Sequence, residues 1–280
     1  MTEQRALVRE SGVGRLAKFA LPYVAKAFAN RFATQAIRYN ELGSCLIQGK
    51  GSGSGWDLAA EVSVAAKFVR APSPVFLDVG ANWGRWSTGM LKLFPGCSKL
   101  LIVEPQPKCL EGVREIDFRE KQIFACAVAD RPGELDFYTA EEAESWTCAS
   151  LFPRTGTYFA DIKQRKLVVP IRVLDDIVSE SGVATIDFMK MDIEGAELLA
   201  LRGAEKTFRA GMIKSLSFEF GSGNINSRTF FRDFWDFLRG YNFSIFRILP
   251  GGGTLRIDHY YEDLEYFRGV TNYVASRESI

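Results

Sequence analysis

Short runs of large apolar residues recur from Val75 onward, and segments long enough for a helix separate them. Strands of a sheet that is covered on both faces are continuous runs of Val, Ile, Leu and Phe, whereas half-exposed strands alternate with polar residues. The pattern therefore predicts a mainly parallel, doubly wound α/β sheet. We expect strands at 75–79, 100–104, 122–127, 187–191, 215–220 and 243–248, and helices at 83–93, 195–210 and 227–238.

The composition is that of a globular protein. The 280 residues are 47% hydrophobic and 25% charged, which excludes disordered, collagen-like and membrane-spanning chains. A net charge of +1 gives no reason to expect nucleic acid as a partner. Five dispersed cysteines and a single histidine predict neither a disulfide framework nor a zinc site. Reduced thiols, and a first segment without the apolar core of a secretory signal, favour a cytoplasmic location.

The first 70 residues are expected to form a helical, basic extension. Residues 1–42 hold more basic than acidic side chains, and their apolar residues recur at helical spacing. We favour a helix packed on the domain with a solvated basic face, and peripheral contact with the inner face of a membrane is the alternative. A Gly/Ser tract at 49–55 predicts a flexible loop, so the main domain is expected to cover 71–280.

An acidic, glycine-containing turn follows the first predicted strand. Gly80 and Gly84 allow the backbone to bend sharply and a ligand to approach the main chain closely. A dinucleotide fingerprint requires a further glycine where this chain has Asn82, and Asp78 would repel a pyrophosphate. The turn therefore predicts a site for a cationic ligand rather than for NAD.

The next two strands end in residues that suit a nucleoside. Glu104 ends the second strand, where a carboxylate can accept hydrogen bonds from both hydroxyls of a ribose. Small residues around Val128 leave room for an adenine ring beside the third strand. Asp130 can accept a hydrogen bond from the amino group of that ring.

Three acids lie at, or just beyond, the carboxyl ends of two later strands: Asp192, Glu194 and Glu219. Because the carboxyl ends of parallel strands meet at one edge of a sheet, we expect their carboxylates to converge. Asp192 could then accept the proton of an acceptor hydroxyl, or Asp192 and Glu219 could hold a Mg²⁺ ion that lowers the pKa of the hydroxyl. A purely structural alternative is that Asp192 or Glu194 caps the helix that follows.

The only histidine, His259, lies in a polar and aromatic segment near the C-terminus. Histidine is a general base near neutral pH, so His259 is a further catalytic candidate. A surface or structural role is the alternative for an isolated histidine.

The blocks D-V-G-A-N-x-G, V-E-P, A-V-A-D-x-x-G, K-M-D-I-E-G-A-E and a later F-E, in this order, resemble the FkbM family of S-adenosylmethionine-dependent methyltransferases. The resemblance covers roughly 75–275. It implies a class I methyltransferase fold, a Rossmann-like seven-stranded sheet whose last strand, here 271–276, is antiparallel. It also implies that the cofactor is bound by Asp78, Gly80, Asn82, Gly84, Glu104 and either Val128 or Asp130.

The same resemblance implies O-methylation of a sugar or natural-product hydroxyl. We expect an S-adenosylmethionine-dependent O-methyltransferase that acts on a sugar of a glycan or glycolipid. A polyketide-type acceptor, an NAD-dependent oxidoreductase and a non-catalytic nucleotide-binding module are the alternatives. An insertion at 133–181, with added strands at 135–139 and 168–173, is expected beside the carboxyl edge of the sheet, where acceptors bind.

Overall fold

The computed structural model describes residues 20, 22–26, 30–51, 58–142, 147–157 and 161–278. The chain divides into two compact units, residues 1–45 and residues 46–280, and α3 (Arg31–Ile47) crosses their boundary. Much of the predicted N-terminal amphipathic helix and part of the Gly/Ser loop lie outside the described residues. Among the described helices, none is both long and apolar enough to cross a membrane.

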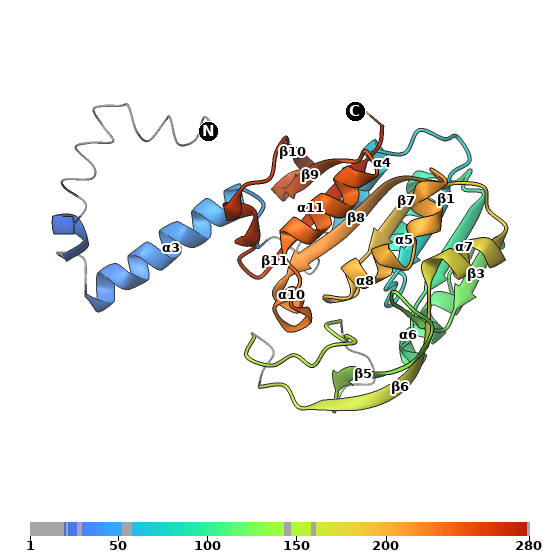
Figure 1. The fold of residues 1–280 in the computed structure, drawn as a ribbon, viewed down its shortest axis with the longest axis horizontal. Coiled ribbons are helices and arrows are strands. Elements are labelled where there is room, and N and C mark those ends of the chain that lie inside the picture. The colour runs from blue at the N-terminus through green and yellow to red at the C-terminus, as the bar shows by residue number, and fades with distance from the viewer. Residues whose placement is uncertain are drawn as a thin grey trace. The chain divides into compact units, whose positions relative to one another are not determined.

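An eight-stranded sheet forms the centre of the second unit (Figure 1). The strand order is β10-β9-β11-β8-β7-β1-β2-β3. Neighbours from β3 to β8 are parallel, and β11 is antiparallel to both β8 and β9. The strands are β1 (Val75–Val79), β2 (Lys99–Val103), β3 (Lys121–Phe124), β7 (Ile186–Met191), β8 (Ile213–Gly221), β9 (Ser244–Leu249), β10 (Gly253–Ile257) and β11 (Val270–Ser276).

This topology confirms the expected class I methyltransferase fold with its antiparallel last strand. The expected number of seven strands was wrong by one. The additional strand is β10, which pairs with β9 as an antiparallel edge hairpin. The turn between the two strands contains Gly251 and Gly252, both with positive φ, a conformation that glycine adopts without strain.

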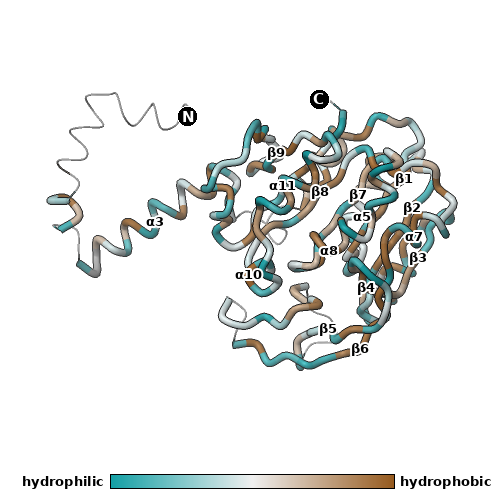
Figure 2. Tube along the Cα trace, viewed as in Figure 1, coloured by the Kyte–Doolittle hydropathy of each residue, from teal (hydrophilic) through white to brown (hydrophobic). Residues whose placement is uncertain are grey.

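Helices cover both faces of the sheet because successive residues of each buried strand point to opposite sides. Phe76 packs with one apolar cluster, whereas Leu77 and Val79 pack with the other. The first face is covered by α4 (Leu58–Lys67), α5 (Arg85–Leu93) and α6 (Pro107–Arg114). The second is covered by α7 (Leu174–Ser181), α8 (Glu197–Arg202), α9 (Glu205–Arg209) and α11 (Phe231–Gly240). Figure 2 shows apolar residues concentrated along the central strands.

The sheet-bearing unit begins earlier than the expected boundary near residue 70. Its first residue is Leu46, so α4 belongs to this unit rather than to the N-terminal extension. The physical reason is burial: Val62 and Val64 of α4, together with Phe68, pack in the apolar cluster on the first face.

Two of the predicted helices differ from their expected ranges. The helix expected at 195–210 forms as α8 and α9, with Gly203 between them, where a β-carbon would collide with the carbonyl oxygen of Ala129. The carboxylate of Asp175 then accepts hydrogen bonds from the amides of Lys206 and Thr207 at the start of α9. The helix expected at 227–238 forms a few residues later, as α11, and a separate short helix, α10 (Ser222–Ser227), precedes it.

The two added strands of the insertion are present and form a second, smaller sheet. It has the order β4-β6-β5 and consists of β4 (Ala127–Val128), β5 (Gly133–Ala140) and β6 (Gln164–Arg172). Figure 1 shows β5 and β6 beside the large sheet, near α8 and α10. The end of the expected insertion, α7, instead packs against the large sheet through Leu174 and Ile177.

Candidate active site

A cavity of about 740 Å³ opens at the carboxyl ends of β1, β2, β7 and β8. This volume lies in the range of small-molecule binding sites. Parallel sheets bind their ligands at this edge, where neighbouring crossovers leave the sheet on opposite faces. The insertion forms part of the wall through Phe137, Thr147, Cys148, Ala149, Leu151 and Arg154.

The turn after β1 has the close backbone packing that its glycine predicts. Gly80 has φ +75°, and a β-carbon at this position would collide with the carbonyl oxygen of Asp192. The amides of Gly80 and Ala81 donate to the carbonyl oxygen of Val103 at 2.9 and 3.2 Å. Asn82 has φ +50°, a conformation that asparagine tolerates better than most residues. Gly80, Ala81 and Asn82 of this turn all line the cavity.

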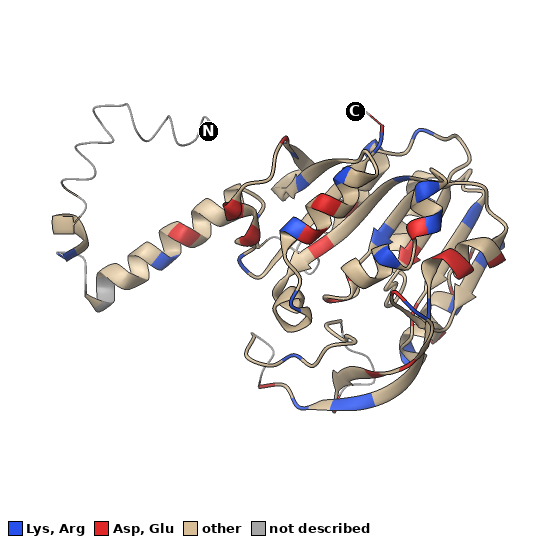
Figure 3. Ribbon diagram, viewed as in Figure 1, with Lys and Arg blue, Asp and Glu red and all other residues tan. Residues whose placement is uncertain are grey.

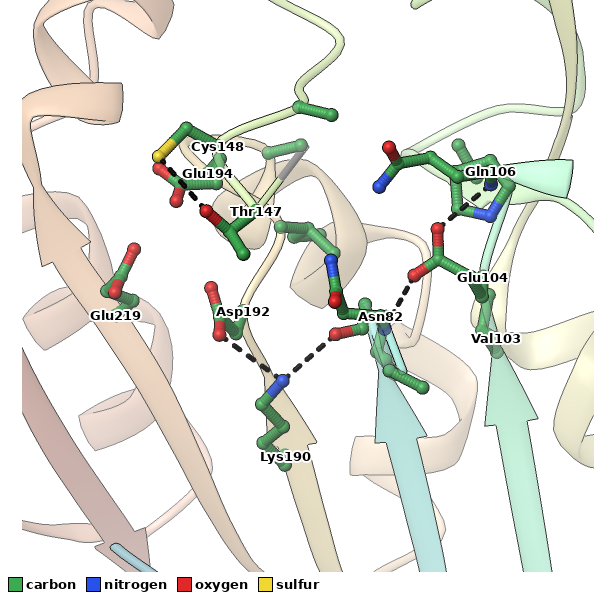
Figure 4. Close-up of a pocket in the computed structure, with 18 of the residues that line it drawn as sticks. Asn82, Val103, Glu104, Gln106, Thr147, Cys148, Lys190, Asp192, Glu194 and Glu219 are labelled. Atoms are coloured by element: carbon green, nitrogen blue, oxygen red, sulfur yellow. Dashed lines mark hydrogen bonds and ion pairs between the residues drawn. The ribbon is translucent and has the colours of Figure 1, made fainter. Parts of the chain in front are cut away.

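Glu104 is fixed in the crevice between β1 and β2, on the right of Figure 4. Its Oε2 accepts a hydrogen bond from the amide of Asn82 at 2.7 Å, and its Oε1 accepts one from the amide of Gln106 at 2.9 Å. Burial raises the pKa of Glu104, and the two amides oppose that shift. The carboxylate lines the cavity at the expected position of a nucleoside ribose.

Three residues predicted to bind the cofactor do not line the cavity formed by the described residues. Asp78 points towards α5 and accepts a hydrogen bond from the Ser87 hydroxyl at 2.6 Å, because it shares the face of β1 that carries Phe76. Gly84, with φ +70°, packs behind the turn, where a β-carbon would lie 2.5 Å from Ile116 Cδ1. Asp130 is exposed. Among the predicted adenine contacts, only Val128 lines the cavity.

The three predicted acids do converge, on the left of Figure 4. One carboxylate oxygen each of Asp192, Glu194 and Glu219 lies within 4.8 Å of the others. Asp192 follows β7 directly, Glu194 lies in the loop before α8, and Glu219 lies near the end of β8. The cavity therefore has a carboxylate cluster on one side and the Glu104 crevice on the other.

Glu194 forms a buried ion pair with a residue that the sequence analysis missed. Arg154 Nη2 lies 2.8 Å from Glu194 Oε2, and the two side chains are 0% and 9% exposed. Burial raises the pKa of Glu194 to about 8, although Arg154 opposes the shift. Because a guanidinium keeps its charge, Arg154 favours the ionised form of the Glu194 carboxyl group, whereas burial favours the neutral form. Arg154 lies in an irregular segment, where no local pattern distinguishes it.

Lys190 is a second functional residue that was missed. Its ammonium donates to the carbonyl oxygen of Gly80 at 2.9 Å, and it lies 3.3 Å from Asp192 Oδ2 and 3.6 Å from Asp78 Oδ1. Burial lowers the pKa of Lys190, but Asp192 and Asp78 outweigh burial and raise it above the ordinary value. The sequence does contain a signal for Lys190, namely a single charge within the apolar end of a predicted strand. A lysine buried in this way requires charged or polar partners, which points to a role in the site.

Glu197 stabilises the loop between β7 and α8. Its two carboxylate oxygens accept hydrogen bonds from the amides of Ile193 and Gly195, each at 2.9 Å. The first position of the helix has no side-chain cap. The capping alternative for Asp192 and Glu194 is therefore wrong, since Lys190 and Arg154 engage their carboxylates instead.

His259 lies away from the carboxylates. It follows β10, and Ile257 at the end of β10 pairs with Ile245 near the start of β9. Because β9 runs in the same direction as β8, the start of β9 lies at the amino edge of the sheet. The residues after β10 therefore also lie at the amino edge, opposite the cavity. The side chain is exposed and packs only near the ring of Tyr261 among the contacts described. The topology thus separates His259 from the other catalytic candidates.

The two tryptophans beside the turn leave the cavity open. Trp86 is buried and packs between the rings of Phe76 and Phe188, at centroid distances of 6.1 and 5.9 Å. Trp83 is 38% exposed. Both line the cavity, whose volume remains large enough for a nucleoside and a second small group.

Comparison with known proteins agrees with this geometry. Residues 78–245 match the family model described as the methyltransferase FkbM domain. The 2-O-methyltransferase NoeI of Sinorhizobium fredii is 31% identical over 147 residues, which cover 49% of this chain and 59% of the relative. The methyltransferase sdnD of Sordaria araneosa is 24% identical over 160 residues, covering 48% and 61%. The chain thus matches less than two thirds of the length of either relative.

A solved structure, methyltransferase FkbM from Methylobacillus flagellatus KT, has 18% sequence identity and a TM-score of 0.48. The match covers 76% of this chain and 47% of that one. The family model alone covers more than half of the present sequence, and it includes both the glycine turn and the three carboxylates. The chain belongs to the FkbM methyltransferase family.

Proposed function

We propose that the protein transfers a methyl group from S-adenosylmethionine to a hydroxyl of a sugar in a glycan or glycolipid. The observation that carries the proposal is the division of one cavity into two chemically different sides (Figure 4). Glu104 and the Gly80–Asn82 backbone suit a nucleoside with a free ribose. Asp192, Glu194 and Glu219 suit an acceptor that donates hydrogen bonds from hydroxyls.

The proposed reaction needs a proton acceptor beside the acceptor hydroxyl. Bound S-adenosylmethionine supplies an electrophilic methyl carbon on its sulfonium sulfur. Asp192 orients the hydroxyl and takes up its proton as the carbon–sulfur bond breaks and the carbon–oxygen bond forms. Among the three acids, Asp192 has the accessible side chain, at 22% exposure, whereas Glu194 and Glu219 are buried. The products are the methyl ether, S-adenosylhomocysteine and a protonated carboxyl group.

A Mg²⁺-assisted reaction is the second version of this proposal. Asp192 and Glu219 would supply ligands, with the ion lowering the pKa of the acceptor hydroxyl. These carboxylates suit proton uptake better than they suit the binding of a metal ion. The reason is that Lys190 and Arg154 already balance the charges of Asp192 and Glu194. Loss of activity in chelator and its recovery with Mg²⁺ would favour the metal version, and full activity in chelator would exclude it.

The sugar acceptor is supported by the carboxylate-rich side of the cavity and by the printed function of NoeI, a 2-O-methyltransferase. The test is transfer of a labelled methyl group to a panel of neutral oligosaccharides, glycolipids and polyketide alcohols. Label in the sugars alone supports the proposal, and label in the polyketides alone favours the natural-product alternative. Calorimetry that shows NAD binding without S-adenosylhomocysteine binding would instead favour an oxidoreductase.

Peripheral membrane contact through residues 1–42 is the alternative to a helix that packs on the domain with a solvated basic face. It is supported by the basic residues and helical apolar spacing of that segment, and it would bring the enzyme to a lipid-linked acceptor at the inner membrane face. Sedimentation with anionic liposomes should be stronger for the full chain than for a chain that lacks residues 1–42. Equal sedimentation would remove the membrane contact but not the methyl transfer.

A further inference from the structure

One buried ammonium joins two parts of the site that are 110 residues apart in the chain. Lys190 on β7 and Asp78 on β1 are direct partners in the parallel register of the two strands. Their side chains therefore lie on the same face of the sheet. Lys190 reaches from there to the carbonyl oxygen of Gly80 and to the carboxylate of Asp192 (Figure 4).

The two acids beside Lys190 differ in what they can contact. Asp192 lines the cavity, whereas Asp78 has 0% exposure and is not among the lining residues described. Asp78 nevertheless lies 3.6 Å from the ammonium of Lys190, which does line the cavity. Asp78 itself does not line the cavity that the described residues form, and its charge is partly balanced by the ammonium of Lys190. Glu61 of α4 adds a third negative charge near the same ammonium.

We propose that Lys190 is a positioning residue that holds the cofactor turn and Asp192 together, and that Asp78 acts as the counter-ion of Lys190 rather than as a contact of the bound cofactor. The identity of the ligand rests on the proposed function. The arrangement has a use in the reaction, because Asp192 loses its charge when it takes up the hydroxyl proton. Burial raises the pKa of Asp78, and the ammonium of Lys190, 3.6 Å away, opposes that shift, so Asp78 can serve as the counter-ion of Lys190 when Asp192 is protonated.

The inference can be tested with two ligands that differ by one positive charge. S-adenosylhomocysteine has a neutral thioether, whereas sinefungin has an additional amine at the position of the transferable methyl group. Asp78→Asn makes the site more positive and should weaken sinefungin relative to S-adenosylhomocysteine. Lys190→Met makes the site more negative and should have the opposite effect. The ratio of the two dissociation constants should change by roughly three- to tenfold in each direction, as expected for a charge that solvent partly screens.

Both dissociation constants are measured by calorimetry on the full chain and on each variant, with the double variant Asp78→Asn, Lys190→Met included. We expect the ratio in the double variant to return close to that of the unchanged protein, because one charge of each sign is removed. A residue that only stabilises the fold would weaken both ligands equally, which leaves the ratio unchanged. The opposite signs of the two single variants are therefore the decisive result.

Two variants serve as controls. Lys190→Arg keeps the charge and should keep the ratio. Lys166→Met removes a lysine that is also paired with an aspartate, Asp136, but whose side chain is 60% exposed on β6, where Figure 3 shows Lys and Arg residues together. Lys166 is not among the residues that line the cavity, so its removal should leave the ratio unchanged.

Unchanged ratios in both single variants, or changes of the same sign, would overturn the inference. If Lys190→Met does not fold, Asp78→Asn decides alone, and an unchanged ratio in that variant is sufficient to reject the role of Asp78. Failure of the unchanged protein to bind either ligand would instead contradict the proposed function. The two failures are therefore distinguishable.

Discussion

Arg154 and Glu194 form an ion pair of 2.8 Å that is almost completely removed from solvent. It joins the insertion to the loop after β7, and the hydroxyl of Ser150 strengthens the same connection by donating to the carbonyl oxygen of Glu194 at 2.8 Å. Gly223 allows this close packing, since a β-carbon there would lie 2.7 Å from Arg154 Nη1. These contacts therefore fix the insertion, which forms one wall of the cavity, against the loop that carries Glu194.

We expect Arg154→Met to lower the free energy of unfolding by about 3–5 kcal/mol, because it leaves the carboxylate of Glu194 buried without its partner. Urea denaturation measures the loss. The control is Arg172→Met, which breaks the 2.6 Å pair with Glu180, whose side chain is 53% exposed. That pair should contribute about 0–1 kcal/mol. Equal losses in the two variants would contradict the role of burial.

Replacement of Glu104 by Gln should weaken S-adenosylhomocysteine at least about tenfold, which corresponds to roughly 1.4 kcal/mol. The amide of glutamine cannot accept hydrogen bonds from both backbone amides that Glu104 now engages, so the group facing the ribose is misoriented. Calorimetry measures the affinity. Glu115→Gln, at an exposed position after α6, should bind as the unchanged protein does. An unaltered affinity of Glu104→Gln for S-adenosylhomocysteine would show that Glu104 does not bind the ribose.

Asp192→Asn should retain the cofactor and lose about 10²–10⁴-fold in kcat, the usual contribution of a positioned general base. The amide keeps the shape of the side chain but cannot take up the hydroxyl proton. The measurement is transfer of labelled methyl to the acceptor found in the panel, together with S-adenosylhomocysteine affinity. The exposed Asp176→Asn on α7 is the matched control. A normal kcat in Asp192→Asn would show that a group other than Asp192 acts as the general base.

Glu197 should make the folded protein less stable as the pH rises from about 5 to 8. Burial raises its pKa from 4.5 to about 7, so the native state binds this proton more tightly than the unfolded chain does. The stabilisation is complete below pH 4.5 and is lost as the pH rises through about 7. The difference corresponds to roughly 3 kcal/mol.

Urea denaturation at several pH values tests this expectation on the unchanged protein and on Glu197→Gln. The variant is less stable at every pH, because glutamine cannot accept both amide hydrogen bonds in the loop. Its stability should nevertheless fall less between pH 5 and pH 8 than that of the unchanged protein. Parallel curves for the two proteins would show that Glu197 does not titrate in this range.

Gly80→Ala should cost more stability than Gly182→Ala, although both glycines have φ between +70° and +75°. A β-carbon at Gly80 meets the carbonyl oxygen of Asp192, whereas none of the described atoms lies within 4 Å of the same position at Gly182. Gly182→Ala should therefore show the backbone strain alone, about 1–2 kcal/mol. Denaturation of both variants measures the difference, and equal losses would mean that the backbone shifts away from the collision without cost.

The glycine turn shows which residues of the site can be predicted from local sequence and which cannot. Gly80, Asn82 and Glu104 lie immediately after strands, so their place at the carboxyl edge follows from the strand positions alone. Asp78 and Gly84 belong to the same motif but do not line the cavity in the structure described. Their orientation depends on which side of β1 is covered by α5 and on how α6 packs behind the turn, and neither fact can be read from the motif itself.

By itself, the sequence determined the sheet, the family and most of the edge residues of the site, because strand patterns and strand-end motifs are encoded by neighbours in the chain. Only the tertiary structure decided that Lys190 and Arg154 pair with Asp192 and Glu194 and that His259 lies at the opposite edge. A buried charge needs a partner, and the partners here come from other strands and from the insertion. Contacts between such distant segments depend on strand order and packing, which no local pattern specifies.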